Sequence, residues 1–170
     1  MRNAHQVDTE EYLNAVSALI AEGREVTVPV RGGSMNPFLV DNRDCVLLVP
    51  APERLRRGDI VLFRRSSGQY VLHRIVAVRR SRPGGHEPVY FMRGDAQEMT
   101  EGPVARAQVR ALAARVMRQG RWLTDRDLRV LFFRHLWCRR YFPRRAALAV
   151  YRLVRRITAD RTADNLQDSR

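Results

Sequence analysis

The sequence contains no lysine, so all 31 of its Lys+Arg residues are arginines. This absence excludes a lysine general base, a Schiff-base lysine and the lysine of a phosphate-binding P-loop. Cysteine is also scarce. Cys45 and Cys138 are too few for a disulfide framework, and no metal-ligand spacing occurs. We therefore expect reduced, structural thiols, and neither a metal nor a cofactor.

Long apolar runs are missing too. No stretch approaches the ~18–20 residues that a membrane-spanning helix needs. The N-terminus lacks the basic-then-apolar pattern of a signal peptide. We therefore expect a cytoplasmic protein that is at most peripheral at the membrane. The 170 residues, 45% of them hydrophobic, suit one compact domain with attachments.

The positive charge is unevenly spread along the chain. Its 18 acidic residues leave a net charge of +13, of which residues 118–170 contribute +9, with 14 arginines against 5 acids. The residues before them carry only the remaining +4. Such a cationic C-terminal segment predicts an acidic partner, which could be an anionic lipid surface, nucleic acid or an acidic protein.

Residues 1–24 are predicted to be an N-terminal segment, and its amphipathic helix is expected to span residues 8–22. Asp8 and Glu11 fit a capping pattern at its start, and Gly23 fits its end. Apolar residues at helical spacing form a stripe that we expect to dock on the next domain: Leu13, Val16, Leu19 and Ile20.

Residues 25–123 are predicted to form a β domain. The connections show no helical pattern, which favours antiparallel pairing, and we expect a small closed or half-closed antiparallel β-barrel. Turn residues such as those at 50–52, 57–59, 66–68 and 83–85 separate the strands. The expected strands are 25–30, 45–49, 60–64, 70–78, 89–93 and 109–117, with a short return strand at 121–123.

Residues 124–170 are predicted to form a basic helical extension, broken at Pro143 and frayed from residue 158. Each helical piece has an apolar side: Leu128, Leu131, Phe132 and Leu136 in the first, Ala147, Tyr151, Val154 and Ile157 in the second. The extension could lie on an anionic membrane surface, or pack on the barrel as a solvated hairpin. Nucleic acid is the less favoured partner, because no helix-turn-helix or zinc signature is present.

The stretch 31–37, with sequence Arg-Gly-Gly-Ser-Met-Asn-Pro, follows the first predicted strand. Two glycines allow a tight backbone path ahead of Ser34, and Pro37 disfavours helix after it. Such a turn can present a serine hydroxyl to a cleft, with a backbone N–H beside it as an oxyanion donor. The same residues are also ordinary loop residues.

Nucleophilic serine catalysis needs a base within reach, and usually a group that orients this base. His73 lies within a predicted strand and shares a face with Val71 and Ile75, so it is either that base or a core histidine. The carboxylates that could orient it follow in residues 91–101, where Asp95 and Glu101 are the candidates.

Four boxes then stand out in order: 32–37 (GGSMNP), 57–63 (RGDIVLF), 73–76 (HRIV) and 93–97 (RGDAQ). We call them the serine, RGD, histidine and aspartate boxes. Together they resemble the signal peptidase family, most closely its Ser-His branch of endoplasmic-reticulum, archaeal and sporulation-type enzymes. The resemblance covers about residues 28–115. The Ser–Lys mechanism used by other members of the superfamily is excluded, because the chain has no lysine.

The resemblance implies a role for each matching residue. Ser34 is the nucleophile, and its backbone N–H helps to hold the oxyanion. His73 takes the serine proton and later gives it to the leaving amine. The orienting acid is Glu101 by alignment, where the family has aspartate, or Asp95 by residue type. We favour Asp95, because Glu101 stands in a Gly-Pro loop, 101–103.

The sequence thus predicts a serine endopeptidase that removes a leader or signal-like segment from a peptide or protein. The family's substrates lie extended beside a strand and have small residues just before the cut. Two other functions stay open: a catalytically inactive, peptide-binding module of the same fold, and an Arg-rich protein that binds nucleic acid or a membrane surface.

Overall fold

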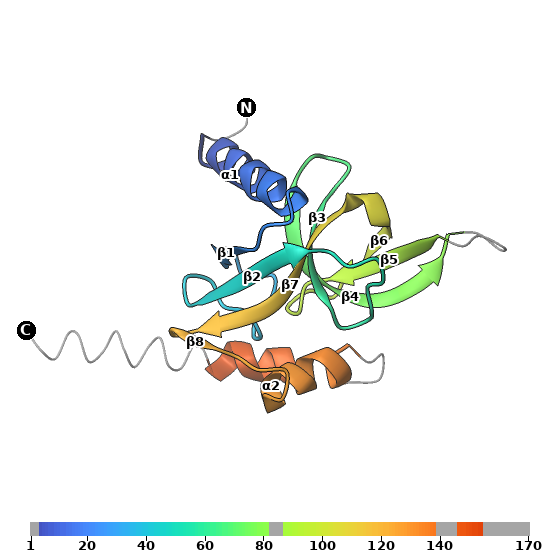
Figure 1. Ribbon diagram of the computed structural model, residues 1–170. Coiled ribbons are helices and arrows are strands. Elements are labelled where there is room, and N and C mark those ends of the chain that lie inside the picture. Colours follow the sequence, from blue (N-terminus) through green and yellow to red (C-terminus); the bar gives the residue numbers. More distant parts are fainter. Residues whose placement is uncertain (1–3, 82–86, 139–145, 155–170) are drawn as a thin grey trace, which may run out of the picture. The chain divides into compact units, whose positions relative to one another are not determined.

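A computed structural model of the chain describes residues 4–81, 87–138 and 146–154. The chain divides into two compact units, residues 1–139 and 140–170. The described part of the first unit holds helix α1 (Ala4–Ala21), one sheet, the 3-10 turn η1 (Arg106–Gln108), helix α2 (Leu128–Leu131) and the π-helical turn η2 (Phe132–Leu136) (Figure 1). In the second unit, residues 146–154 are helical.

The sheet is antiparallel, with strand order β1-β2-β7-β3-β4-β5-β6 and with β8 paired to β7. Its strands are β1 (Val26–Pro29), β2 (Asp44–Pro50), β3 (Ile60–Arg64), β4 (Tyr70–Arg80), β5 (Pro88–Arg93), β6 (Glu101–Ala105), β7 (Val109–Arg118) and β8 (Arg121–Trp122). The predicted β class and antiparallel pairing are confirmed.

The expectation of a closed barrel is wrong, because among the described strands β1 and β6 remain unpaired edges. Both edge strands contain a proline, Pro29 in β1 and Pro103 in β6. Proline has no N–H to donate to a neighbouring strand, so within a sheet it is found mainly in edge strands such as these. An open sheet leaves an edge that another chain can pair with.

The sheet separates two apolar clusters, and β3 contributes to both. Ile60 and Leu62 belong to a cluster with α1, β1, β2 and the loop after β1, whereas Val61 and Phe63 belong to a cluster with β4, β5 and β6. The strand is buried on both faces because its residues are apolar without alternation. β3 therefore forms the rigid centre of the sheet.

The predicted stripe of α1 does dock on the sheet, since Val16 and Ile20 are buried in the first cluster. The helix ends as expected at Gly23, whose φ of +85° suits glycine and whose N–H donates to the Ile20 carbonyl. Its start was misplaced, because α1 begins at Ala4 and Asp8 lies inside the helix.

The predicted strands agree with the structure within about two residues at each end, but β6 was missed. The Gly102-Pro103 pair in this strand resembles a loop signal. The predicted turn at 83–85, the break at Pro143 and the frayed end from residue 158 lie outside the described residues.

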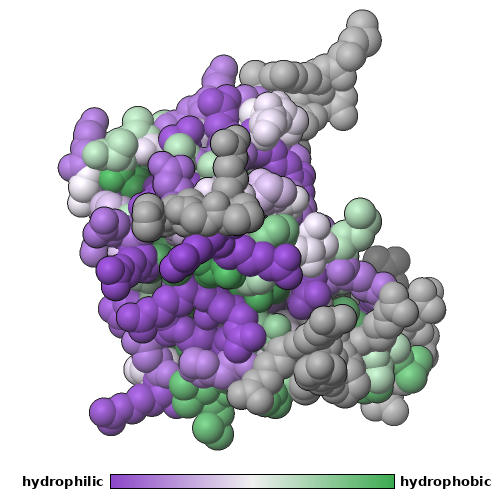
Figure 2. Space-filling model, turned by 90° about the vertical axis from the view of Figure 1, so that its right-hand side faces the viewer, coloured by the Kyte–Doolittle hydropathy of each residue, from purple (hydrophilic) through white to green (hydrophobic). Residues whose placement is uncertain are grey.

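The C-terminal segment 128–138 belongs to the same compact unit as the sheet. Its predicted apolar side is not the packing side: Leu128, Leu131 and Leu136 are exposed, whereas Val130 and Phe133 pack on the first cluster and Trp137 is buried. The described surface in Figure 2 is largely hydrophilic, with small apolar patches between polar residues. No described helix is long and apolar enough to cross a membrane.

Candidate active site

Ser34 stands in a loop that is anchored in the apolar core on both sides. Before it, Val30 is buried, and after it Met35, Phe38 and Leu39 are buried in the first cluster. Ser34 itself stays half-buried. Gly32, two residues before the serine, has a φ of +80°, which allows the chain to turn sharply there. The loop thus holds Ser34 between the exposed residues 31–33 and the buried Met35.

The aspartate box packs against the backbone of this serine. The N–H of Ala96 donates to the Ser34 carbonyl at 2.9 Å. Gly94 approaches so closely that a Cβ in its place would lie 2.5 Å from the same oxygen. Close approach, not a positive φ, is therefore what requires glycine at position 94.

His73 is almost completely buried in β4, with 1% of its surface exposed. Its ring lies near Phe63, and Nδ1 lies 3.1 Å from Oε1 of Glu101. The two atoms lie within hydrogen-bonding distance, although within the described residues no hydrogen bond is formed at Nδ1. The Glu101 carboxylate therefore acts on the imidazole through its charge, in contact with it.

Glu101 is held in place by a residue that the sequence prediction passed over. Arg65 donates to both of its carboxylate oxygens, from Nε at 2.6 Å and from Nη2 at 2.5 Å. These hydrogen bonds hold the pKa of Glu101 below its usual range, against the opposing effect of its burial. Arg65 follows β3 in a turn, where a single arginine gives no sequence signal for such a role.

Effects of opposite sign act on the pKa of the His73 imidazole. Burial lowers the pKa of His73, the Glu101 carboxylate raises it again in part, and Arg65 adds to the lowering. The net shift is downward, so His73 is neutral at neutral pH. A neutral imidazole beside an ionised carboxylate is the state in which histidine can accept a proton.

Asp95, the acid that we favoured, does not have the orienting position. Its two carboxylate oxygens accept from Arg74, at 2.9 Å from Nε and 2.7 Å from Nη2, and both side chains are only 3% exposed. Burial alone would lower the pKa of Arg74, but Asp95 outweighs it and raises this pKa, so the guanidinium stays charged. Glu101, and not Asp95, is the carboxylate in contact with His73.

Three of the boxes, and the residue that follows the fourth, meet at the Arg74 guanidinium. Besides Asp95 of the aspartate box, it donates to the carbonyl of Gly58 in the RGD box at 2.9 Å. It also stacks over Phe38, directly after the serine box, at 4.9 Å. Arg74 belongs to the histidine box, so one buried side chain joins three of the boxes and packs on the residue that follows the fourth.

The described residues show no hydrogen bond between the Ser34 hydroxyl and the His73 imidazole. The aspartate box contacts the Ser34 carbonyl through its backbone at Gly94 and Ala96, and its Asp95 side chain binds Arg74, the chain neighbour of His73. Serine and base stand in one framework without a direct bond.

An apolar groove of about 550 Å³ adjoins this framework. Its wall includes Val30 and Arg31, which lead into the serine box, and Leu72, whose side chain leaves β4 on the face opposite to that of His73. α1 closes the groove with Tyr12 and Leu13. The groove runs along β1, an edge strand of the sheet.

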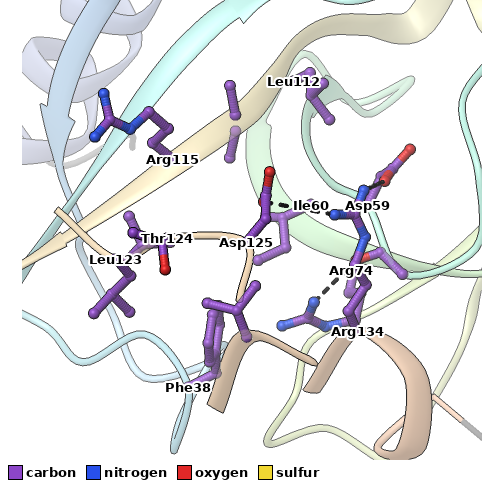
Figure 3. Close-up of a pocket in the computed structure, with 15 residues that line it drawn as sticks. Phe38, Asp59, Ile60, Arg74, Leu112, Arg115, Leu123, Thr124, Asp125 and Arg134 are labelled. Carbon is purple, nitrogen blue, oxygen red and sulfur yellow. Dashed lines mark hydrogen bonds and ion pairs between the residues drawn. The ribbon is translucent and has the colours of Figure 1, made fainter. Parts of the chain in front are cut away.

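A second pocket, of about 200 Å³, has Asp59, Arg74 and Arg134 on one side and Leu123 and Thr124 on the other (Figure 3). Neither Ser34 nor His73 lines this pocket.

The described residues hold no group of three or more His, Cys, Asp or Glu side chains arranged for a metal. Cys45 and Cys138 are free thiols. Comparison with protein-family models finds no matching family, and comparison with curated protein sequences finds no match.

Proposed function

We propose that the protein is a serine endopeptidase that removes a leader or signal-like segment from a peptide or protein. Ser34 is the nucleophile, His73 the general base and Glu101 the carboxylate that supports it. The observation that carries this proposal is the buried, neutral His73 in contact with Glu101, which Arg65 keeps ionised. A buried histidine beside an ionised carboxylate is a pairing typical of active sites.

The reaction follows from these roles. As His73 takes the hydroxyl proton, Ser34 Oγ attacks the scissile carbonyl carbon, and the resulting oxyanion is held by backbone N–H groups, that of Ser34 included. The protonated imidazole, stabilised by the Glu101 charge, gives its proton to the leaving amine. Water, activated by the same histidine, then hydrolyses the acyl-enzyme and restores the free serine.

The substrate is an extended peptide segment. The β1 edge and the adjoining apolar groove suit strand addition, in which main-chain hydrogen bonds bind and alternate side chains enter pockets. The groove reaches Val30 and Arg31, which lead into the serine box, so it would hold apolar side chains of a bound peptide near the serine loop. We therefore expect small or apolar residues just before the cut.

The test compares Ser34→Ala, His73→Ala and the double variant on peptides with small residues before the cut. Each single change should lower kcat by about 10³-fold or more, and the double variant should lose little beyond that, because the two residues act as a unit. His135→Ala is the matched control, since His135 is exposed on η2. A thermal melt of every variant separates lost chemistry from lost fold.

Two results would count against the peptidase. One is a His73→Ala variant that cleaves at the wild-type rate, because the base would then be another group. The other is a His73→Ala variant that unfolds, together with a Ser34→Ala variant indistinguishable from wild type. In that case His73 is a core histidine.

The second candidate function is a peptide-binding module of the same fold without catalysis. The observation that favours it is the missing hydrogen bond between Ser34 and His73 in the described residues. It predicts that wild-type protein binds the peptide, that no cleavage occurs, and that Ser34→Ala binds as tightly. Mass spectrometry of the peptide after long incubation separates the two functions.

We further propose that the second unit holds the protein at an anionic membrane surface. Residues 140–170 carry a net charge of +5, with eight arginines against three acids. Within the helical residues 146–154, Val150, Leu153 and Val154 are exposed. Exposed apolar side chains together with arginines are the composition of an interfacial helix.

A further inference from the structure

The segment 128–138, which we call the C-terminal clamp, contacts the RGD, histidine and aspartate boxes and Phe38, directly after the serine box. Its Arg134 packs its backbone on Gly58, where a Cβ would lie 2.6 Å from the Arg134 carbonyl oxygen, and its side chain pairs with Asp59 at 3.0 Å. Phe133 lies 4.9 Å from the Phe38 ring and 6.0 Å from the Arg74 guanidinium. The clamp therefore covers the point at which the boxes meet.

Trp137 makes the contact that leads to the nucleophile. Its indole N–H donates to the Asp95 carbonyl at 3.1 Å, and its side chain is buried. The peptide group that this carbonyl belongs to also contains the N–H of Ala96, which donates to the Ser34 carbonyl at 2.9 Å. A single peptide group is thus held at one end by the clamp and at the other end holds the serine.

A peptide group is planar and rigid, so its carbonyl and its N–H cannot move independently. Fixing the Asp95 carbonyl fixes the direction in which the Ala96 N–H points. This N–H in turn fixes the backbone of Ser34, from which the hydroxyl projects. The hydrogen bond from Trp137 also polarises the peptide group and strengthens the bond at its far end.

We infer that Trp137 is a positioning residue for Ser34, acting through the Asp95–Ala96 peptide group. The inference rests on the proposed peptidase function. Trp137 touches neither the reacting atoms nor the substrate groove. Its loss leaves the nucleophile, the base and the groove in place and loosens only the backbone that aims the hydroxyl. Misplacement of a reacting group by about 1 Å can cost about 10²-fold in rate.

The experiment uses the full chain and replaces Trp137→Phe, which keeps the ring in the aromatic cluster and removes the N–H donor. Trp122→Phe is the matched control, because Trp122 is the only other tryptophan of the chain. It lies in β8 and stacks on Arg115 of β7. Trp137→Phe should lower kcat by about 10–100-fold with little change in KM, because peptide binding does not involve the hydroxyl direction. Trp122→Phe should leave both constants unchanged.

A second readout does not depend on catalysis. Hydrogen exchange of the Ala96 amide, followed by NMR, should become severalfold faster in Trp137→Phe, while the amides of the β2–β7 ladder keep their rates. If Trp137→Phe lowers the melting temperature strongly, replacing Trp137 with β-(3-benzothienyl)alanine in the Trp122→Phe background removes only the N–H. That variant should show the same kcat loss.

The inference is overturned if Trp137→Phe keeps the wild-type kcat and the wild-type exchange rate at Ala96. It is also overturned if kcat falls only in proportion to the loss of folded protein. Absence of hydrolysis by the wild-type protein counts against the proposed function instead. In that event the Ala96 exchange rate still decides whether Trp137 holds the serine loop.

Discussion

His73 and Arg74 are neighbours in β4, so their side chains leave the strand on opposite faces, and each meets a carboxylate there. Arg74 and Asp95 are both buried and hydrogen-bonded at two points, which is how a buried ion pair is tolerated inside a protein. Arg65 and Glu101 are about one-third exposed, and Glu101 also contacts the imidazole. The Arg74–Asp95 pair holds the boxes together, whereas the Arg65–Glu101 pair places a carboxylate against His73.

We therefore predict different outcomes for the two carboxylates. Glu101→Gln should stay folded and lower kcat by about 10²–10⁴-fold, because the imidazolium loses its stabilising charge. The Glu101 charge raises the pKa of His73, and Arg65 lowers it. Removing that charge should lower the pKa further, so the acid limb of the pH–rate profile moves to lower pH.

Asp95→Asn is the matched comparison, since it also replaces one carboxylate with an amide. It leaves the Arg74 charge buried without its partner, and breaking a buried pair in this way costs about 3–5 kcal/mol. Denaturant unfolding should show that loss for Asp95→Asn and a much smaller one for Glu101→Gln. If Asp95→Asn is stable and slow while Glu101→Gln keeps full rate, the assignment of the orienting acid is reversed.

At the scale of elements, most of the fold was predictable because turn residues separate the strands. β3 was placed from Ile60 to Arg64, as found, because it is a short apolar run between an RGD turn and a serine-glycine turn. His73 and Ser34 were chosen as candidate site residues through their boxes. These are local signals, and each can be seen within a few residues of the chain.

The rest depends on pairings between distant segments. β6 was missed because a Gly-Pro pair indicates a loop, although register with β5 brings Glu101 opposite Met92 and so beside His73. Arg65 and Trp137 were missed because the partner of each lies more than 30 residues away in the chain. The open sheet could not be foreseen from strand count alone, since closure depends on which strands reach the edges.

The contact between the serine loop and the aspartate box gives a prediction at this scale. Gly94→Ala adds a Cβ that would lie 2.5 Å from the Ser34 carbonyl oxygen, so the loop has to shift. Such crowding costs about 1–3 kcal/mol and displaces the hydroxyl. We expect kcat to fall by about 10²-fold or more, with KM little changed. A Gly94→Ala variant with wild-type kcat would show that the loop absorbs the methyl group without moving Ser34.

At the scale of the whole molecule, the arginines have two roles: they make specific contacts within the fold, and they give the chain its positive charge. In the first unit many of them make specific contacts: Arg74 joins the boxes, Arg65 holds Glu101, and Arg118 and Arg43 bind the buried Asp44 carboxylate. Burial raises the pKa of Asp44, but the hydrogen bonds from Arg43 and Arg118 outweigh it and lower that pKa. The high arginine count is therefore partly structural, and the net positive charge per residue is higher in residues 140–170, at +5, than in the residues before them.

This division changes where the chain should be cut to test the membrane proposal. A cut after residue 124 removes the clamp with the second unit, and so uncovers Phe38, Arg74 and the Asp95 carbonyl. A cut after residue 139 follows the boundary between the compact units. We expect the 1–139 protein to melt close to wild type and the 1–124 protein to melt clearly lower, because the latter loses buried aromatic packing and a buried hydrogen bond.

The membrane prediction is then made on the 1–139 protein. Full-length protein should co-sediment with vesicles containing anionic lipid, less so at high salt, and weakly with neutral vesicles, because each exposed arginine near such a surface contributes about 1 kcal/mol. The 1–139 protein lacks the +5 charge of residues 140–170 and should stay in solution while it keeps its peptidase rate. If it still co-sediments, the exposed Leu128, Leu131 and Leu136 of the clamp bind the membrane instead. Salt-sensitive binding of the full-length protein to duplex DNA or RNA, without vesicle binding, would make nucleic acid the acidic partner.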